Sequence, residues 1–295
     1  MTVLTARLLV DGKNQLGECV LWNASEQRVY WTDVYACRLY SCDAEGRELT
    51  SRALPEKLGS FSFDPDGNLL CAFASGLFRY RLHSGQCDRL TSFEPELERT
   101  RLNDGRCDRA GRFVVGGCHQ EFYNPVSSVV SYEGGSATRR LIDKVALTNG
   151  IAFSLDGSRM YFCDSETRRY YYYDYDTRTG TLGERHLFTQ IPDTDGFADG
   201  SAVDAADNLW NARYYHGIVQ QYHPDGSEGL RVQLPTACVT CVCFGGKDLD
   251  TLFISTGRKD LTPAQQAAQP SAGGLFVVQP GVRGVPEALF AERLF

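Results

Sequence analysis

A unit of two hairpins recurs six times along the chain, and this repeat limits the possible fold more than any other feature of the sequence. In each unit a short apolar strand meets a turn rich in Asp, Gly or Asn, and a second apolar strand follows. The first hairpins span residues 20–33, 61–72, 107–116, 152–163, 203–212 and 242–254. Short apolar runs joined by such turns are the signature of β-hairpins.

A second hairpin follows the first in most units. Its strands and turns fall in residues 38–46, 77–85, 170–180, 219–226 and 275–281. Four strands that recur at a period of about 40–50 residues are typical of a propeller blade. We therefore predict an all-β fold, a six-bladed β-propeller with four-stranded antiparallel blades, as a single domain over residues 1–295. A helical turn is expected only within residues 262–269.

The composition narrows the class of protein. Of the 295 residues 42% are hydrophobic and 12% aromatic, which is ample for a buried core, and the net charge of -7 argues against a general attraction to nucleic acid. No apolar run reaches the roughly 18 residues of a membrane span, and residues 1–13 lack a signal-peptide core. Eleven scattered cysteines indicate reduced thiols. We expect a cytoplasmic protein with no membrane, nucleic-acid or obligate protein partner.

Four side chains with oxygen atoms stand at the same point of units one, three, four and five, just before the first strand. They are Glu18, Asn103, Asn149 and Asp199. Because the first strand of a propeller blade begins near the central channel, the four could converge there. Two carboxylates and two amides suit a hard divalent cation, whereas no His or Cys joins them by position. Turn chemistry alone does not explain why they recur at one strand end.

The sequence resembles the SMP-30/gluconolactonase/luciferin-regenerating-enzyme-like family over essentially its whole length. The motifs that carry the resemblance are Leu16-Gly17-Glu18, Arg101-Leu102-Asn103-Asp104-Gly105, Asn149-Gly150 with Ser154, Asp199-Gly200 with Asp204, Leu209-Trp210 with Ala212, and Cys241-Val242-Cys243-Phe244-Gly245-Gly246. Two departures stand beside them. Cys19-Val20 replaces the Gly-Pro that often follows the metal-binding Glu, and Ala198 replaces the Pro that often precedes the metal-binding Asp.

This resemblance implies one divalent metal cation in the central channel of a six-bladed propeller. Glu18, Asn149 and Asp199 are its implied protein ligands. The identity of the cation stays open among calcium, zinc, magnesium, manganese and iron, since oxygen ligands accept several divalent ions.

The implied activity is hydrolysis of a sugar lactone, a pentono- or hexono-1,4- or 1,5-lactone, to its aldonic acid. The cation would polarise the lactone carbonyl and stabilise the oxyanion, and Asp199 would act as the general base for the attacking water. Activation of that water by the cation alone is the other route. Arg101, Asn103 and Glu121 fall at substrate-binding positions of the family, and the Arg101 guanidinium is a forked donor suited to sugar hydroxyls.

Two other readings stay open. One is a metal-dependent hydrolase of another ester or of a phosphotriester on the same scaffold, and the other is a non-enzymatic calcium-binding propeller. A serine hydrolase is disfavoured because the chain has no Gly-x-Ser-x-Gly motif. The Cys238–Cys243 segment and the aromatic run 170–175 are both interpreted as buried packing, since alternate positions of a strand share a face.

Overall fold

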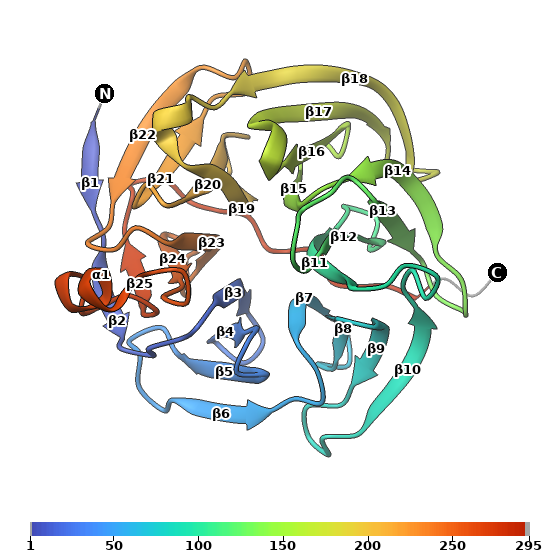
Figure 1. Ribbon diagram of the computed structural model, residues 1–295, viewed down its shortest axis with the longest axis horizontal. Helices are drawn as coiled ribbons and strands as arrows, with labels where there is room; N and C mark the ends of the chain where they lie inside the picture. Colours follow the sequence, from blue (N-terminus) through green and yellow to red (C-terminus); the bar gives the residue numbers. More distant parts are fainter. Residues whose placement is uncertain (1, 293–295) are drawn as a thin grey trace. The chain divides into compact units, whose positions relative to one another are not determined.

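Short strands joined by tight turns make up nearly all of the structure, a computed structural model that describes residues 2–292. The described chain divides into two units, one of residues 2–57 and 189–286 and the other of residues 58–188 and 287–292. Each unit contains three sheets (Figure 1). The prediction of a single domain over residues 1–295 stays a prediction.

The first unit holds sheets one, five and six in chain order. Sheet one consists of β3 (Gly17–Asn23), β4 (Arg28–Asp33), β5 (Arg38–Asp43) and β6 (Thr50–Ala53). Sheet five consists of β19 (Phe197–Val203), β20 (Leu209–Tyr214), β21 (Ile218–Tyr222) and β22 (Glu228–Gln233), with β1 (Val3–Thr5) added parallel to β22. Sheet six consists of β23 (Val239–Gly245), β24 (Thr251–Thr256), β25 (Leu275–Val278) and β2 (Arg7–Val10).

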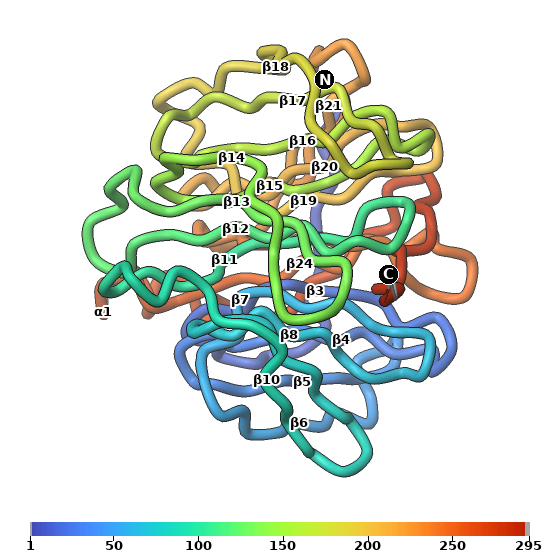
Figure 2. The backbone as a smooth tube through the Cα atoms, turned by 90° about the vertical axis from the view of Figure 1, so that its right-hand side faces the viewer, coloured from blue at the N-terminus to red at the C-terminus, as the bar shows by residue number. Residues whose placement is uncertain are grey.

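The second unit holds sheets two, three and four. Sheet two consists of β7 (Leu58–Phe63), β8 (Leu69–Phe73), β9 (Gly76–Tyr80) and β10 (Cys87–Ser92). Sheet three consists of β11 (Thr100–Cys107), β12 (Phe113–His119), β13 (Ser127–Tyr132) and β14 (Arg139–Val145). Sheet four consists of β15 (Thr148–Phe153), β16 (Arg159–Asp164), β17 (Arg169–Asp176) and β18 (Thr181–Gln190), which Figure 2 shows stacked in chain order.

Six four-stranded antiparallel blades confirm the predicted fold class, a six-bladed β-propeller. One strand was not foreseen from the sequence: β2 from the amino-terminal segment pairs antiparallel with β25 and completes sheet six. The expected helical turn is present as α1 (Pro263–Ala268), which begins with a capping box at Thr262.

Apolar side chains from neighbouring sheets pack together within each unit. In the first unit, Cys241 and Cys243 share a core cluster with Trp22 and Trp31, which confirms buried packing for these thiols. In the second unit, the aromatic run contributes Tyr173 and Tyr175 to the core between sheets three and four. Every cysteine is free of disulfide bonds within residues 2–292. None of the helices in that range has the length and apolarity that crossing a membrane would require.

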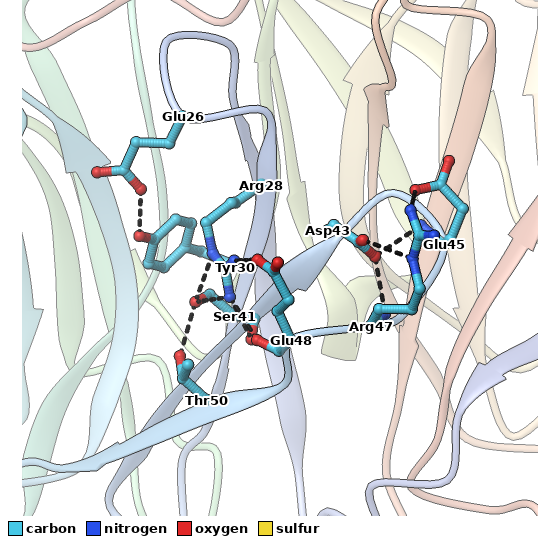
Figure 3. A network of polar contacts seen from close by, with 9 residues as sticks. All are labelled: Glu26, Arg28, Tyr30, Ser41, Asp43, Glu45, Arg47, Glu48 and Thr50. Atoms are coloured by element: carbon cyan, nitrogen blue, oxygen red, sulfur yellow. Dashed lines mark hydrogen bonds and ion pairs between the residues drawn. The ribbon is translucent and has the colours of Figure 1, made fainter.

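The same turn sequence, Asp-x-x-Gly-Arg, occurs once buried and once exposed. In both copies the Asp carboxylate accepts backbone N–H groups and the Arg side chain: Asp108 pairs with Arg112 at 2.9 Å, and Asp43 pairs with Arg47 at 2.9 Å (Figure 3). The Arg112 side chain is 1% exposed and the Arg47 side chain 70%. Arg112 also donates to two backbone carbonyls of the β17–β18 turn, so the buried copy links sheets three and four.

This pair of turns gives a stability test with an internal control. Arg112→Ala leaves the Asp108 carboxylate buried without its cation, and we expect a loss of about 3–5 kcal/mol in the free energy of unfolding. Arg47→Ala removes the same contact where water and salt screen it, so its denaturation curve should nearly coincide with that of the wild type. The test is urea unfolding of both variants, monitored by fluorescence. Equal unfolding midpoints for the two variants would contradict the stabilising link that Arg112 forms between sheets three and four.

Candidate metal centre

A β-bulge interrupts the first strand of every sheet, close to its beginning. The register shifts follow Glu18 in β3, Leu58 in β7, Leu102 in β11, Asn149 in β15, Ala198 in β19 and Val239 in β23. A bulge kinks a strand and turns side chains away from the regular pleat, and bulges are frequent beside active sites. The repeat therefore places a kinked backbone at the same point of all six sheets.

The four side chains singled out in the sequence all lie at these bulges. Glu18 and Asn149 are the last paired residues before the bulge, and Asn103 and Asp199 are the first residues inside it. The expectation that they precede the first strands is wrong, because each strand starts before the bulge and continues through it. Cys19, which follows Glu18, has a left-handed φ of 44°, a costly conformation for a residue with a side chain.

In the first unit, Glu18 and Asp199 lie on two strands that both pack against β23 (Figure 1). The Thr240 hydroxyl of β23 donates to the carbonyl of Gly17 on one side. Asp199 is buried, with 7% of its surface exposed, and Glu18 is half-buried. Two carboxylates are thus held at the bulges of sheets one and five, whose first strands both pack against the first strand of sheet six.

Asp199 also influences the thiol at the start of β23. Burial raises the pKa of Cys238 to about 11; the hydrogen bond with Tyr214 lowers it, and the Asp260 and Asp199 carboxylates raise it further. A raised pKa keeps a thiol protonated at neutral pH and makes it a weak nucleophile.

In the second unit, a chain of hydrogen bonds fixes the orientation of Asn149. Its Nδ2 donates to Ser165 Oγ at 2.8 Å, and its Oδ1 accepts from Asn103 Nδ2 at 3.2 Å. Asn103 Oδ1 in turn accepts from the Arg101 guanidinium at 2.7 Å. An amide oxygen has two lone pairs and can accept from more than one partner. The network therefore fixes which end of the Asn149 amide carries the acceptor.

Two residues that were given no role in the sequence analysis hold the bulge of β15. The Asp104 carboxylate accepts the backbone N–H of Ile151 at 2.9 Å, and the Tyr170 hydroxyl donates to the carbonyl of Gly150. Burial raises the pKa of Asp104, against the lowering influence of Arg106. Asp104 belongs to the motif Arg101-Leu102-Asn103-Asp104-Gly105, which carries the family resemblance. The sequence therefore singles out this position but does not show which group its carboxylate binds. Tyr170 carries no sequence signal beyond its place in an aromatic run.

A matched pair of acids anchors the segments that lead into Glu18 and Asn149. Asp33, at the end of β4, accepts the backbone N–H groups of residues 15 and 16 at 2.8 and 3.2 Å. Asp164, at the end of β16, accepts those of residues 146 and 147 at 3.0 and 3.1 Å, although burial raises the pKa of its carboxyl. A comparison of units one and four would reveal both acids, because each ends the second strand of its unit.

Glu121 lies apart from the other predicted substrate-binding residues of its unit. It is exposed on the loop after β12 and forms an ion pair with Arg99. Its backbone N–H donates to His119 Nδ1 at 3.2 Å, a local turn contact. Arg101, by contrast, is buried beside Asn103. The structure therefore joins Arg101 with Asn103 and does not bring Glu121 to them.

The donor set is oxygen-rich and low in charge. Within residues 2–292, no three His, Cys, Asp or Glu side chains gather closely enough to hold a metal ion. The predicted ligands include only two such side chains, with an amide oxygen as the third, so they do not depend on a cluster of that kind. Carboxylate and amide oxygens fit hard divalent cations, which commonly complete their coordination with water.

Comparison with known proteins identifies the family. Residues 16–258 match the family described as SMP-30/Gluconolactonase/LRE-like region. The chain belongs to this family. It is 39% identical to the L-arabinolactonase of Azospirillum brasilense, covering 97% of this chain and 95% of that protein, and 33% identical to the pentonolactonase XacC of Haloferax volcanii, covering 99% and 100%. The resemblance stated from sequence motifs is confirmed.

A solved structure shares the fold over the full length. The calcium-binding protein regucalcin from Agrobacterium tumefaciens superposes with a TM-score of 0.94 at 29% identity and covers 100% of both chains. A luciferin-regenerating enzyme has a TM-score of 0.88 at 21% identity and covers 96% of this chain and 99% of that one. The second likeness concerns the fold alone.

The bulge of β15 offers a direct test of local geometry. Gly150 has a φ of 67°, and a Cβ added there would lie 2.2 Å from the Tyr170 hydroxyl oxygen. We expect Gly150→Ala to cost about 1 kcal/mol for the left-handed backbone and about 1–3 kcal/mol more for the clash. Gly67, with a φ of 78° and no atom within 4 Å of an added Cβ, is the control. Gly67→Ala should show only the backbone cost in thermal unfolding; equal losses would contradict the clash.

Proposed function

We propose that this protein is a metal-dependent sugar lactonase that hydrolyses an aldono-lactone to its aldonic acid. The observation that carries the proposal is that two side chains with oxygen atoms are buried at the bulges: Asp199, and Asn149, whose amide nitrogen donates to Ser165. Relatives named as arabinolactonase and pentonolactonase, aligned over nearly the whole chain, support a lactone of a five-carbon sugar acid as the first substrate class to examine.

We assign the divalent cation to Glu18, Asn149 and Asp199. When bound, it would draw electron density from the lactone carbonyl and stabilise the negative charge that develops on that oxygen. The amide of Asn149 is neutral, so the three proposed ligands together carry only the charge of the two carboxylates. That total charge suits a divalent ion.

The protein side chains would carry the proton and hold the substrate. As the water oxygen bonds to the carbonyl carbon, the Asp199 carboxylate accepts a proton from that water. The bond between the carbonyl carbon and the ring oxygen then breaks, and the ring oxygen gains a proton to become the hydroxyl of the open acid. Arg101 is held by the Leu102 carbonyl at 2.9 Å and by Asn103, so its guanidinium is preset for donation to sugar hydroxyls. Glu121, exposed and paired with Arg99, is proposed to contact the outer part of the sugar.

The first experiment tests the reaction and the cofactor together. Chelator-treated protein is assayed with a panel of pentono- and hexono-1,4- and 1,5-lactones by a pH indicator, with calcium, magnesium, manganese, iron or zinc added singly. We expect turnover well above spontaneous opening only when a divalent metal is restored. Turnover that is indifferent to metal would contradict the cofactor assignment. Metal binding with no turnover on any lactone would instead favour a calcium-binding protein.

The second experiment tests the proposed base. Asp199→Asn keeps the size of the side chain but removes its basicity and one charge, and loss of general base catalysis typically costs about 10²–10⁴-fold in rate. We expect kcat to fall by at least about 100-fold, with the circular dichroism spectrum unchanged. Asp225→Asn is the control, because Asp225 lies in an exposed turn where it binds Ser227. Wild-type turnover in Asp199→Asn would contradict the assigned role.

A further inference from the structure

In each sheet of the first unit, a polar side chain on the second strand donates to a backbone carbonyl at the bulge of the first strand. Asn211 Nδ2 donates to the Asp199 carbonyl at 2.7 Å, Thr32 Oγ1 to the Glu18 carbonyl at 3.5 Å, and Ser255 Oγ to the Cys241 carbonyl at 3.4 Å. A bulge removes carbonyls from the regular ladder, and a buried carbonyl without a donor is costly. Each of these side chains supplies a donor to such a carbonyl.

The bond at Asp199 is the strongest of the three by geometry. Asn211 is fully buried, and its Nδ2 also donates to Ser201 Oγ at 2.9 Å, so the amide spans the bulge on both sides of Gly200. A hydrogen bond to the carbonyl of Asp199 fixes the peptide that follows its Cα. This bond restrains the backbone from which the Asp199 side chain projects.

The other end of the Asn211 side chain has no partner. Its Oδ1 is buried and accepts no hydrogen bond from residues 2–292. Leaving a buried acceptor unpaired costs free energy. The amide therefore acts through its N–H groups, which reach the Asp199 carbonyl and Ser201 Oγ.

We infer that Asn211 is a positioning residue for Asp199, and that Thr32 is its weaker counterpart for Glu18. This inference rests on the proposed metal site. Ser255 makes the same kind of bond in sheet six, and it also contacts Thr240 Oγ1 at 2.8 Å, which connects it to the Gly17 carbonyl beside Glu18. Outer residues that orient metal ligands typically change metal affinity or activity by about 10–100-fold when they are removed.

Two replacements that match each other in shape separate the hydrogen bond from packing. Asn211→Val has no side-chain donor. Asn211→Thr has nearly the shape of the Val variant and carries a hydroxyl like that of Thr32. Titration of the chelator-treated proteins with Mn²⁺ by calorimetry measures metal affinity without any turnover. We expect Asn211→Val to weaken Mn²⁺ binding by about 10-fold or more, Asn211→Thr to recover most of that loss, and the exposed-turn control Asp225→Asn to bind as the wild type does.

The outcomes distinguish this inference from the function on which it rests. If Asp199→Asn weakens Mn²⁺ binding while Asn211→Val binds like the wild type, the metal site stands and the positioning role is overturned. Equal weakening in the Val and Thr variants would also overturn it, because packing would then be the cause. If the wild type and Asp199→Asn bind Mn²⁺ alike, both the metal assignment and the inference fail. Should Asn211→Val not fold, Thr32→Val gives the same test at Glu18, with a smaller expected loss.

Discussion

The bulge near the beginning of each first strand is the constraint on which the candidate site depends. A regular strand would point alternate side chains to the two faces of its sheet, where they would enter the cores between blades. The bulge releases one or two residues from this alternation, and it does so at the same point of all six sheets. Polar side chains such as Glu18 and Asp199 can therefore occupy strands whose remaining residues are almost wholly buried and apolar.

Releasing backbone from the ladder creates a second requirement, because buried N–H and carbonyl groups must find other partners. The bulges of β15 and β19 meet it with different partners. At β15 one partner is Asp104 of the neighbouring sheet and another is Tyr170 of the same sheet. At β19, Asn211 on the next strand of the same sheet donates to the Asp199 carbonyl. The bulge beside Asn149 therefore depends on the packing between sheets three and four, whereas the hydrogen bond from Asn211 stays within one sheet.

The fold could be predicted from sequence because its signals are local and repeated. The carboxylates of Asp108 and Asp204 each accept hydrogen bonds from the backbone N–H groups two and four residues later. The turn residues from which the hairpins were predicted therefore also stabilise the turns. The outer strand of sheet six could not be foreseen, because pairing between residues 7–10 and 275–278 leaves no local mark. The position of Glu121 was also beyond sequence reasoning, since a loop has no register to fix it.

The candidate ligands were recognisable because they recur at one point of the repeat, whereas the residues that hold them were not. Asp104 and Asp33 are visible as acids beside motifs, and only their hydrogen bonds show which backbone groups they bind. Asn211 has no sequence signal at all, because one Asn in an apolar strand resembles any tolerated polar substitution. The role inferred for Asn211 depends on its hydrogen bond to the carbonyl of Asp199, which lies twelve positions earlier in the chain.

The difference between an amide and a carboxylate explains why the two kinds of ligand are held in different ways. An Asn side chain presents an oxygen at one end and an N–H donor group at the other, so a wrong rotation by 180° would point the donor at a cation. Asn149 accordingly needs a partner for its nitrogen, and Ser165 provides it. A carboxylate presents equivalent oxygens either way, so a fixed backbone is the main requirement for a carboxylate ligand. At Asp199, the proposed ligand, the hydrogen bond from Asn211 to the carbonyl restrains that backbone.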